Sequence, residues 1–179
     1  MRYFSYRQLA LSGMACFALC GPAAAAPSVQ AAFSPERGAL QLILNVIESS
    51  QHSIRMMGYS FTSPEVTSAL VRAHRRGVDV RIVLDDKGNR NKVSQAAINT
   101  AVSAGIPLRT NDRYAIMHDK VLIVDEQTVE TGSFNYTRAG ARKNSENVVV
   151  IREVPELAAT YLQHWQSRWE QGVDWKLKY

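Results

Sequence analysis

The sequence predicts an α/β fold whose sheet is mixed, largely parallel and flanked by helices on both faces. Between residues 34 and 110, short apolar runs alternate with segments in which apolar residues recur at helical spacing, a pattern typical of parallel strands covered by helices. After residue 114, two β-rich runs follow each other closely and predict a hairpin. The 179 residues, 46% of them hydrophobic, suffice for a single buried core and not for two independent domains.

The first helix is expected to begin at residues 34–36 (Ser-Pro-Glu), which combine an N-cap residue, a first-turn proline and an acid, and to run to about residue 50. A strand over residues 54–61 follows. A second Ser-Pro-Glu at residues 63–65 predicts the start of the next helix, which Gly77 ends. The pattern then predicts a strand over residues 78–84, a helix over 92–104 and a short strand over 107–110.

The hairpin is expected to pair residues 116–124 with residues 128–131 across a turn at residues 125–127. Residues 146–152 predict another strand, and the last helix opens near Pro155. Its Trp165 and Trp169 share a face with other apolar residues, so we expect them to pack in the core or at a subunit contact.

Residues 1–25 have the pattern of a signal peptide, which leaves a single domain over residues 26–179. A basic start with Arg2 and Arg7 precedes an apolar run of about a dozen residues and a group of alanines. Cleavage after Ala25 is expected, with cleavage after Ala31 as the alternative. The apolar run is too short to cross a bilayer, so a periplasmic or secreted protein with no stable membrane insertion after signal removal is predicted.

The exported form would contain no cysteine, because Cys16 and Cys20 both lie in the signal peptide. Disulfides and thiolate metal sites are therefore excluded for it. Loss of Arg2 and Arg7 leaves 19 basic against 16 acidic residues and lowers the net charge from +5 to +3. That mild positive charge is compatible with an anionic substrate but does not identify one.

The candidate active site centres on His118 and Lys120. Side chains two positions apart in a strand share a face, so these two converge while Asp119 points to the opposite side. Asp125 has the other parity and sits at the predicted turn. We expect it to be structural, fixing the turn or pairing with a base elsewhere.

Ser133 and Asn135 also lie two apart, directly after Gly132, a residue that lets the backbone turn and approach closely. They would bring an amide, a hydroxyl and backbone N–H groups beside Lys120. Such donors with one cation suit the non-bridging oxygens of a phosphodiester, with Lys120, Ser133 and Asn135 as its phosphate-binding residues. Nothing in this set requires a metal or another cofactor.

These positions form His-x-Lys-x4-Asp-x6-Gly-Ser-x-Asn, and the chain thereby resembles the phospholipase D superfamily, most closely its single-motif bacterial endonucleases. Glu146 extends the resemblance, which implies catalytic roles for His118, Lys120, Ser133, Asn135 and Glu146 and a phosphohistidine mechanism. That mechanism needs two histidines of opposite protonation, yet the chain has one motif. We therefore expect a homodimer that joins two copies of the site, with Glu146 orienting or tuning His118.

The leading interpretation is a nonspecific endonuclease that cleaves DNA, with RNA as a further candidate substrate. Arg138, Arg142 and Lys143 follow the motif closely and could extend a positive rim along a nucleic-acid backbone, or form an ordinary solvated loop. Two alternatives stay open: a phospholipase D acting on membrane phosphodiesters, and a noncatalytic nucleic-acid-binding module. His52, His74 and His164 belong to no second motif and are expected to be surface or internally satisfied histidines.

Overall fold

The computed structural model describes residues 26–36 and 38–177, so the predicted signal peptide lies outside the described residues. The helices and strands of this part of the chain are β1 (Ser28–Ser34), α1 (Ala39–Ser49), β2 (Ser53–Gly58), α2 (Pro64–Arg75), β3 (Asp79–Asp85), the 3-10 turn η1 (Lys87–Asn89), α3 (Lys92–Ser103), β4 (Leu108–Asn111), β5 (Lys120–Val124), β6 (Thr128–Gly132), α4 (Arg138–Arg142), β7 (Glu146–Arg152), α5 (Pro155–Glu170) and β8 (Val173–Asp174).

The strands form one eight-stranded sheet in the order β1-β7-β6-β5-β2-β3-β4-β8. Only the β2–β3 and β3–β4 neighbours are parallel, and the other five neighbouring pairs are antiparallel. The mixed α/β sheet is therefore confirmed, but the expectation that it is largely parallel is wrong. Helical crossovers between parallel neighbours occur only from β2 to β3 and from β3 to β4, whereas β5 pairs antiparallel with both β2 and β6, and β6 pairs antiparallel with β7.

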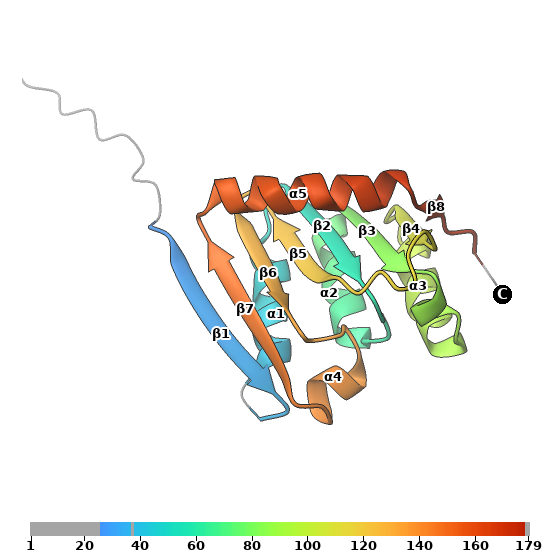
Figure 1. Cartoon of the computed structure of the whole chain (residues 1–179), viewed down its shortest axis with the longest axis horizontal. Helices are drawn as coiled ribbons and strands as arrows, with labels where there is room; N and C mark the ends of the chain where they lie inside the picture. Colours follow the sequence, from blue (N-terminus) through green and yellow to red (C-terminus); the bar gives the residue numbers. More distant parts are fainter. Residues whose placement is uncertain (1–25, 37, 178–179) are drawn as a thin grey trace, which may run out of the picture.

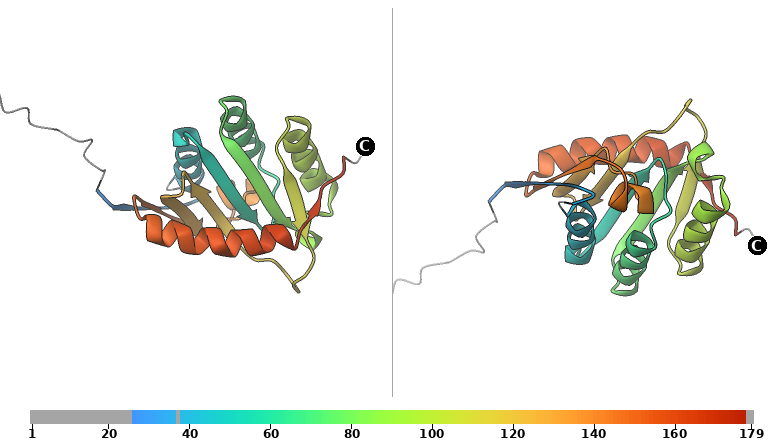
Figure 2. Two further views of the ribbon diagram at one scale, coloured as in Figure 1. Left: turned by 90° about the horizontal axis from the view of Figure 1, so that it is seen from above. Right: turned by 90° about the horizontal axis from the view of Figure 1, so that it is seen from below.

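Helices cover both faces of the sheet, as expected. The helices α1, α2 and α3 lie side by side on one face, and the long α5 crosses the other (Figures 1 and 2). Each face has its own apolar core. Ile43, Leu70 and Ile98 are fully buried under the first three helices, while Trp165 of α5 packs with the apolar side chains on the other face.

Trp165 confirms the prediction of core packing for the last helix. It is 2% exposed, its indole N–H donates to the carbonyl oxygen of Met56, and its ring stacks on Trp169 with centroids 5.2 Å apart. Within residues 26–36 and 38–177, no helix combines the length and apolar character needed to cross a membrane.

The beginning of the domain differs from the prediction. Ser34 ends strand β1, which pairs antiparallel with β7, and α1 begins only at Ala39 after Gly38 in the left-handed region (φ 80°). The hydroxyl of Ser34 donates to the carbonyl oxygen of Gly140 at 2.6 Å and does not cap the helix. The similar signal at Ser63 behaves as predicted, because its Oγ accepts a hydrogen bond from the backbone N–H of Val66.

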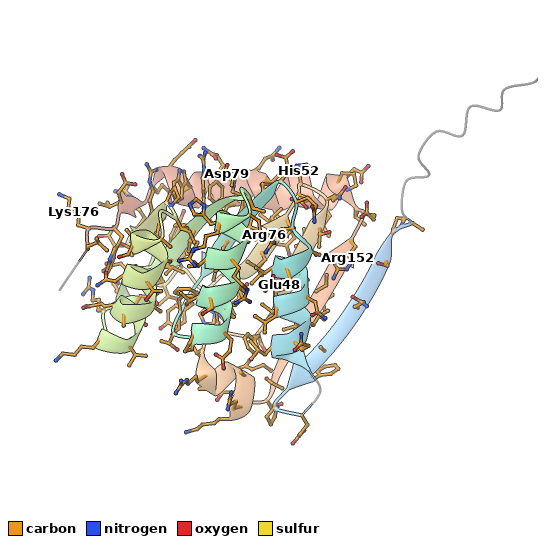
Figure 3. All side chains as sticks on the ribbon, turned by 180° about the vertical axis from the view of Figure 1, so that it is seen from behind. Glu48, His52, Arg76, Asp79, Arg152 and Lys176 are labelled. Carbon is orange, nitrogen blue, oxygen red and sulfur yellow. The ribbon has the colours of Figure 1, made fainter. Side chains whose placement is uncertain are left out.

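The neighbouring helices α1 and α2 are joined at their surface by ion pairs. Glu48 of α1 accepts from Arg72 at 2.5 Å and from Arg76 at 3.2 Å, and Figure 3 shows Glu48 and Arg76 on the adjoining sides of the two helices. These exposed pairs contribute little individually, about 1 kcal/mol or less each. They lie on the helix-covered face, where they help to fix α2 against α1.

Candidate active site

The predicted catalytic residues meet at one end of the sheet, where β5 and β7 begin and β6 ends (Figure 1). This end also carries the carboxyl ends of the parallel strands β2, β3 and β4, the usual position of sites in α/β sheets. An open hollow of about 610 Å³ lies here, lined by His118, Lys120, Gly132, Ser133, Asn135, Glu146 and Asn147. The structure thus brings together all five residues that the sequence predicted as catalytic, along with the motif glycine.

His118 itself is not in a strand. The strand expected over residues 116–124 begins only at Lys120, because the backbone N–H of Met117 donates to a carboxylate oxygen of Asp85 at 2.7 Å and joins no ladder. The loop from β4 to β5 has to cross the end of β3, where Asp85 lies. The exposed His118 still faces the hollow, while Asp119 pairs with His164 of α5 at 3.0 Å, so the predicted divergence of the two side chains is present.

Lys120 lies at the base of the hollow and is only 5% exposed. Its Nζ donates to the carbonyl oxygen of His118 at 2.8 Å and lies 5.5 Å from the ring centroid of Tyr59. Burial lowers the pKa of Lys120, while the carboxylates of Asp119 and Glu146 favour its charged form. A buried ammonium in an otherwise polar hollow attracts an anion more strongly than a solvated surface lysine would.

A hydrogen-bond network connects the ends of β6 and β7. The hydroxyl of Ser133 donates to Glu146 at 2.5 Å and accepts from the backbone N–H of Asn147 at 3.1 Å. The backbone N–H of Ser133 donates to the carbonyl oxygen of Asn147, so this N–H is not available to a substrate, contrary to the sequence-based expectation. Asn144 binds the other oxygen of Glu146, which leaves the carboxylate held from two sides.

Glu146 makes no hydrogen bond to His118 within the described part of one chain, although both line the same hollow. Its orienting role therefore stays a prediction for the assembled site. In contrast to the carboxylate of Glu146, the side-chain oxygen Oδ1 of Asn135 is buried and has no hydrogen-bond partner in the described residues. An amide oxygen in this state costs free energy, and because it can only accept, the group of Asn135 that could donate to a phosphate oxygen is its amide nitrogen Nδ2.

Gly132 is required by close packing. A Cβ at this position would lie 2.2 Å from the carbonyl oxygen of Asn147, a distance that no side chain can tolerate. The prediction that this glycine permits a close backbone approach is confirmed. The approach brings β6 and β7 together where Ser133 and Glu146 leave the sheet.

Asp125 lies at the opposite end of β5 from the hollow and has a structural position. Its carboxylate accepts hydrogen bonds from the backbone N–H groups of Gln51, His52 and Ser53 at 2.7–2.8 Å. Its φ of 51° places it in the left-handed region, at the turn between β5 and β6. Asp125 therefore fixes the start of β2 to the hairpin, as expected from its parity, through backbone groups instead of a basic side chain.

Sequence reasoning missed three residues that support the site. The ring of Tyr59 contacts the imidazole of His118 edge to face, with centroids 4.9 Å apart. Asn89 is 1% exposed and holds the segment that carries Tyr59, because it binds the carbonyl oxygen of Tyr59 at 2.8 Å and the N–H of Phe61 at 2.9 Å. Asp85 positions the chain before His118. Their place at or just beyond the carboxyl ends of the parallel strands β2 and β3 was a signal that could have found them.

The remaining histidines do not complete the site. His52 lies at the far end of the sheet from α4, as Figure 3 shows, and His74 lies in the last turn of α2, at that same end. His164 is engaged with Asp119. None of the three supplies a second imidazole to the hollow of its own chain.

A mixed sheet that presents histidine, lysine, serine, asparagine and glutamate around one open hollow is an arrangement suited to phosphodiester chemistry. The family model described as "Cardiolipin synthase, PLD-like domain" matches residues 43–169, most of the chain. The chain therefore belongs to the phospholipase D-like family, whose members are phosphodiesterases.

Particular relatives agree with this assignment. The crystal structure of Nuc, a phospholipase D family member from Salmonella typhimurium, is 56% identical, with a TM-score of 0.84 over 84% of this chain and 99% of that one. A protein named phospholipase D from Rickettsia conorii is 39% identical over 140 residues, 78% of this chain and 68% of its own length. A mouse protein named mitochondrial cardiolipin hydrolase is 30% identical over 132 residues, 74% of this chain and 58% of its own.

Proposed function

We propose that the chain is a metal-independent phosphodiesterase that cleaves DNA without sequence specificity, with RNA as a second substrate, in the periplasm or outside the cell. One observation carries the proposal: an exposed imidazole, a buried ammonium and the side-chain amide of Asn135 line the same open, polar hollow. The site would bind the phosphate group through Lys120, Asn135 and Ser133, whose hydroxyl would have to exchange Glu146 for a phosphate oxygen. The backbone of a nucleic acid presents that group without regard to sequence.

The chemistry needs two histidines in opposite states. A neutral His118 attacks phosphorus and forms a P–N bond, while a protonated imidazole gives its proton to the leaving oxygen as the P–O bond breaks. Water then attacks the phosphohistidine, loses its proton to the second imidazole and releases His118. Lys120 stabilises the negative charge on the non-bridging oxygens through both steps.

A second copy of the chain would supply the second imidazole. The hollow is open to solvent on the side of His118, and none of the other three histidines of the same chain lines it. Two copies facing each other across a two-fold axis would place two His118, two Lys120 and two Glu146 around one phosphate. Each chain then holds half of an active centre.

The direct test of the function is cleavage of plasmid DNA by the purified protein in buffer containing a strong chelator, over a series of pH values. Cleavage is expected, with a bell-shaped pH dependence from the two histidines. The matched control is His118→Ala, which should remain folded and leave the plasmid intact. Unchanged cleavage by this variant, or loss of wild-type cleavage on chelation, would contradict the mechanism. DNA binding with no cleavage at any pH would identify a noncatalytic binding module.

One feature favours a phospholipase as the second candidate. Ile116 is 48% exposed and lies two residues before His118, so an apolar side chain stands close to the mouth of the hollow. It could rest on a lipid surface, and proteins named phospholipase D are among the relatives. Headgroup release from phosphatidylcholine vesicles without cleavage of DNA would place this function first.

A further inference from the structure

A second hollow adjoins the active-site hollow, and Asn135 lines both of them. Its volume is about 580 Å³, and a third hollow of about 250 Å³ shares Thr62, Pro64 and Val93 with it and continues along α2 and α3. Together they form a groove, here called the α2–α3 groove, that leads from the catalytic residues past Asn135 to the outer surface of the two helices. The second hollow is lined by Ser60, Thr62, Pro64, Val93, Asn135, Thr137, Arg138 and Ala139.

The lining offers hydrogen-bonding groups that the protein leaves unused. Within residues 26–36 and 38–177, the hydroxyls of Ser60 and Thr62 make no hydrogen bond, and the exposed Arg138 makes no ion pair. Arg142, one turn further on, pairs with Glu65 of α2. The guanidinium at the groove is therefore free for an anion, while its neighbour is engaged in holding α4 to α2.

The walls of the groove are fixed to each other by backbone contacts. The N–H groups of Thr62 and Ser63 both donate to the carbonyl oxygen of Tyr136 at 2.9 Å, and Phe61 and Tyr136 form an isolated bridge. Ser60 and Thr62 on one wall are thus held at a set distance from Thr137 and Arg138 on the other. Such a preformed site loses little conformational entropy when a ligand binds.

We propose that the α2–α3 groove binds the nucleotide next to the scissile phosphodiester on one strand of a nucleic acid. Arg138 and the free hydroxyls would bind the neighbouring phosphate and the sugar, and the base would rest on Val93 and Pro64. This assignment rests on the proposed nuclease function. Five of the eight residues that line the second hollow have polar side chains, which supply hydrogen-bonding groups for a phosphate and a sugar, and the apolar remainder of the lining offers a surface for a base.

The test uses a charge of either sign at Val93, which is 63% exposed at the start of α3. Val93→Asp should raise the KM for a labelled oligothymidylate of about ten nucleotides by about threefold to tenfold at low salt, and Val93→Lys should leave it unchanged or lower it. Each value is divided by the KM of the same variant for bis(p-nitrophenyl) phosphate, which has no neighbouring nucleotide to place in the groove when its phosphate lies at the catalytic residues. The matched control is Val173→Asp, because Val173 is 66% exposed on the edge strand β8 and lines none of the three hollows. Its substitution should change the KM for neither substrate.

A raised normalised KM for Val93→Asp, together with an unchanged or lowered one for Val93→Lys, supports the groove. Equal effects, or no effect from either, overturn it. If the wild type hydrolyses the small diester but cleaves no oligonucleotide, the proposed nuclease function has failed. Fluorescence anisotropy then measures binding of the labelled oligonucleotide and tests the groove by itself. Weaker binding by Val93→Asp, but not by Val93→Lys, supports the groove. If Val93→Asp instead impairs only the hydrolysis of phosphatidylcholine vesicles, the groove holds a lipid and the nucleotide assignment is wrong.

Discussion

Replacing Asp125 with alanine is expected to lower the stability of the protein without lowering the activity of its folded fraction. Although the residue belongs to the signature motif, its carboxylate binds three backbone N–H groups at the start of β2 and lies at the far end of β5 from the hollow. The substitution removes all three hydrogen bonds. It also leaves an alanine at a φ of 51°, a conformation that favours asparagine, aspartate or glycine.

The size of the effect follows from these contacts. Hydrogen bonds to a charged group contribute about 1.5–3 kcal/mol each, but the two donors at Gln51 and His52 are exposed and must be discounted. The three together are therefore expected to contribute about 2–4 kcal/mol, and the strained alanine adds about 1 kcal/mol. For a domain of this size, the melting temperature should fall by roughly 6–20 °C.

Thermal unfolding followed by circular dichroism measures the stability, and plasmid cleavage at a temperature where the variant is fully folded measures the activity. Asp125→Asn is the matched control. It keeps one carbonyl oxygen as an acceptor and tolerates the left-handed backbone, so its melting temperature should lie between those of wild type and alanine variant. An alanine variant with unchanged melting temperature and an activity at least about tenfold lower would refute the structural role and place Asp125 in the chemistry.

Three further predictions concern stability and packing. Burial raises the pKa of Glu130 to about 8, with hydrogen bonds from Tyr136 and the backbone opposing the shift. Since the folded state holds this proton more tightly than the unfolded state, the free energy of unfolding should decline by up to about 1.4 kcal/mol per pH unit as the pH rises from about 4.5 to about 8. Glu130→Gln should remove that decline, and urea unfolding at several pH values measures it. Gly132→Ala should abolish cleavage, because its Cβ would overlap the carbonyl oxygen of Asn147, and amide exchange should show loosened ends of β6 and β7. Asn89→Ala should lower the free energy of unfolding measured in urea by about 3 kcal/mol, because it removes three hydrogen bonds to backbone groups, two of them buried and one partly buried.

A defined outcome would contradict each of these three predictions. A glutamine variant at position 130 with the same pH dependence as wild type would show that another group causes the decline. Full cleavage by the alanine variant at position 132 would mean that β6 and β7 can separate without harm to the site. An unfolding free energy unchanged by Asn89→Ala would show that water replaces the lost amide.

Local signals in the sequence predicted elements whose determinants are themselves local. The Ser-Pro-Glu at Ser63 starts α2 because the capping hydroxyl and the amide that it binds are three residues apart. The same three residues at Ser34 do not start a helix, because the hydroxyl of Ser34 binds Gly140 and the preceding segment pairs with β7. Both contacts join residues more than one hundred positions apart, and no local pattern contains them. The prediction of a largely parallel sheet was wrong for the same reason, because β5 pairs antiparallel with β2 through residues that lie far apart in the sequence.

The residues of the candidate site likewise divide into those that local sequence predicted and those that only the folded chain brings together. The motif residues His118 to Asn135 were predictable because their spacing alone places them together once β5 and β6 form a hairpin. Tyr59 and Asn89 were not predicted, because they come from separate elements: Tyr59 contacts His118, and Asn89 holds the backbone of Tyr59, only once the chain has folded. The hydrogen bond between Ser133 and Glu146 depends on the register of β6 against β7, which the sequence does not reveal.

The central claim, that two copies of His118 act on one phosphate, is tested most directly by mixing subunits. Wild-type and His118→Ala chains are refolded together in equal amounts, with the total protein held constant, and cleavage of plasmid DNA is measured in the presence of chelator. If both histidines of a dimer are required, only the pure wild-type dimers are active, and the mixture should retain about one quarter of the wild-type activity. An activity of about one half would show that each chain works alone and would contradict the shared site.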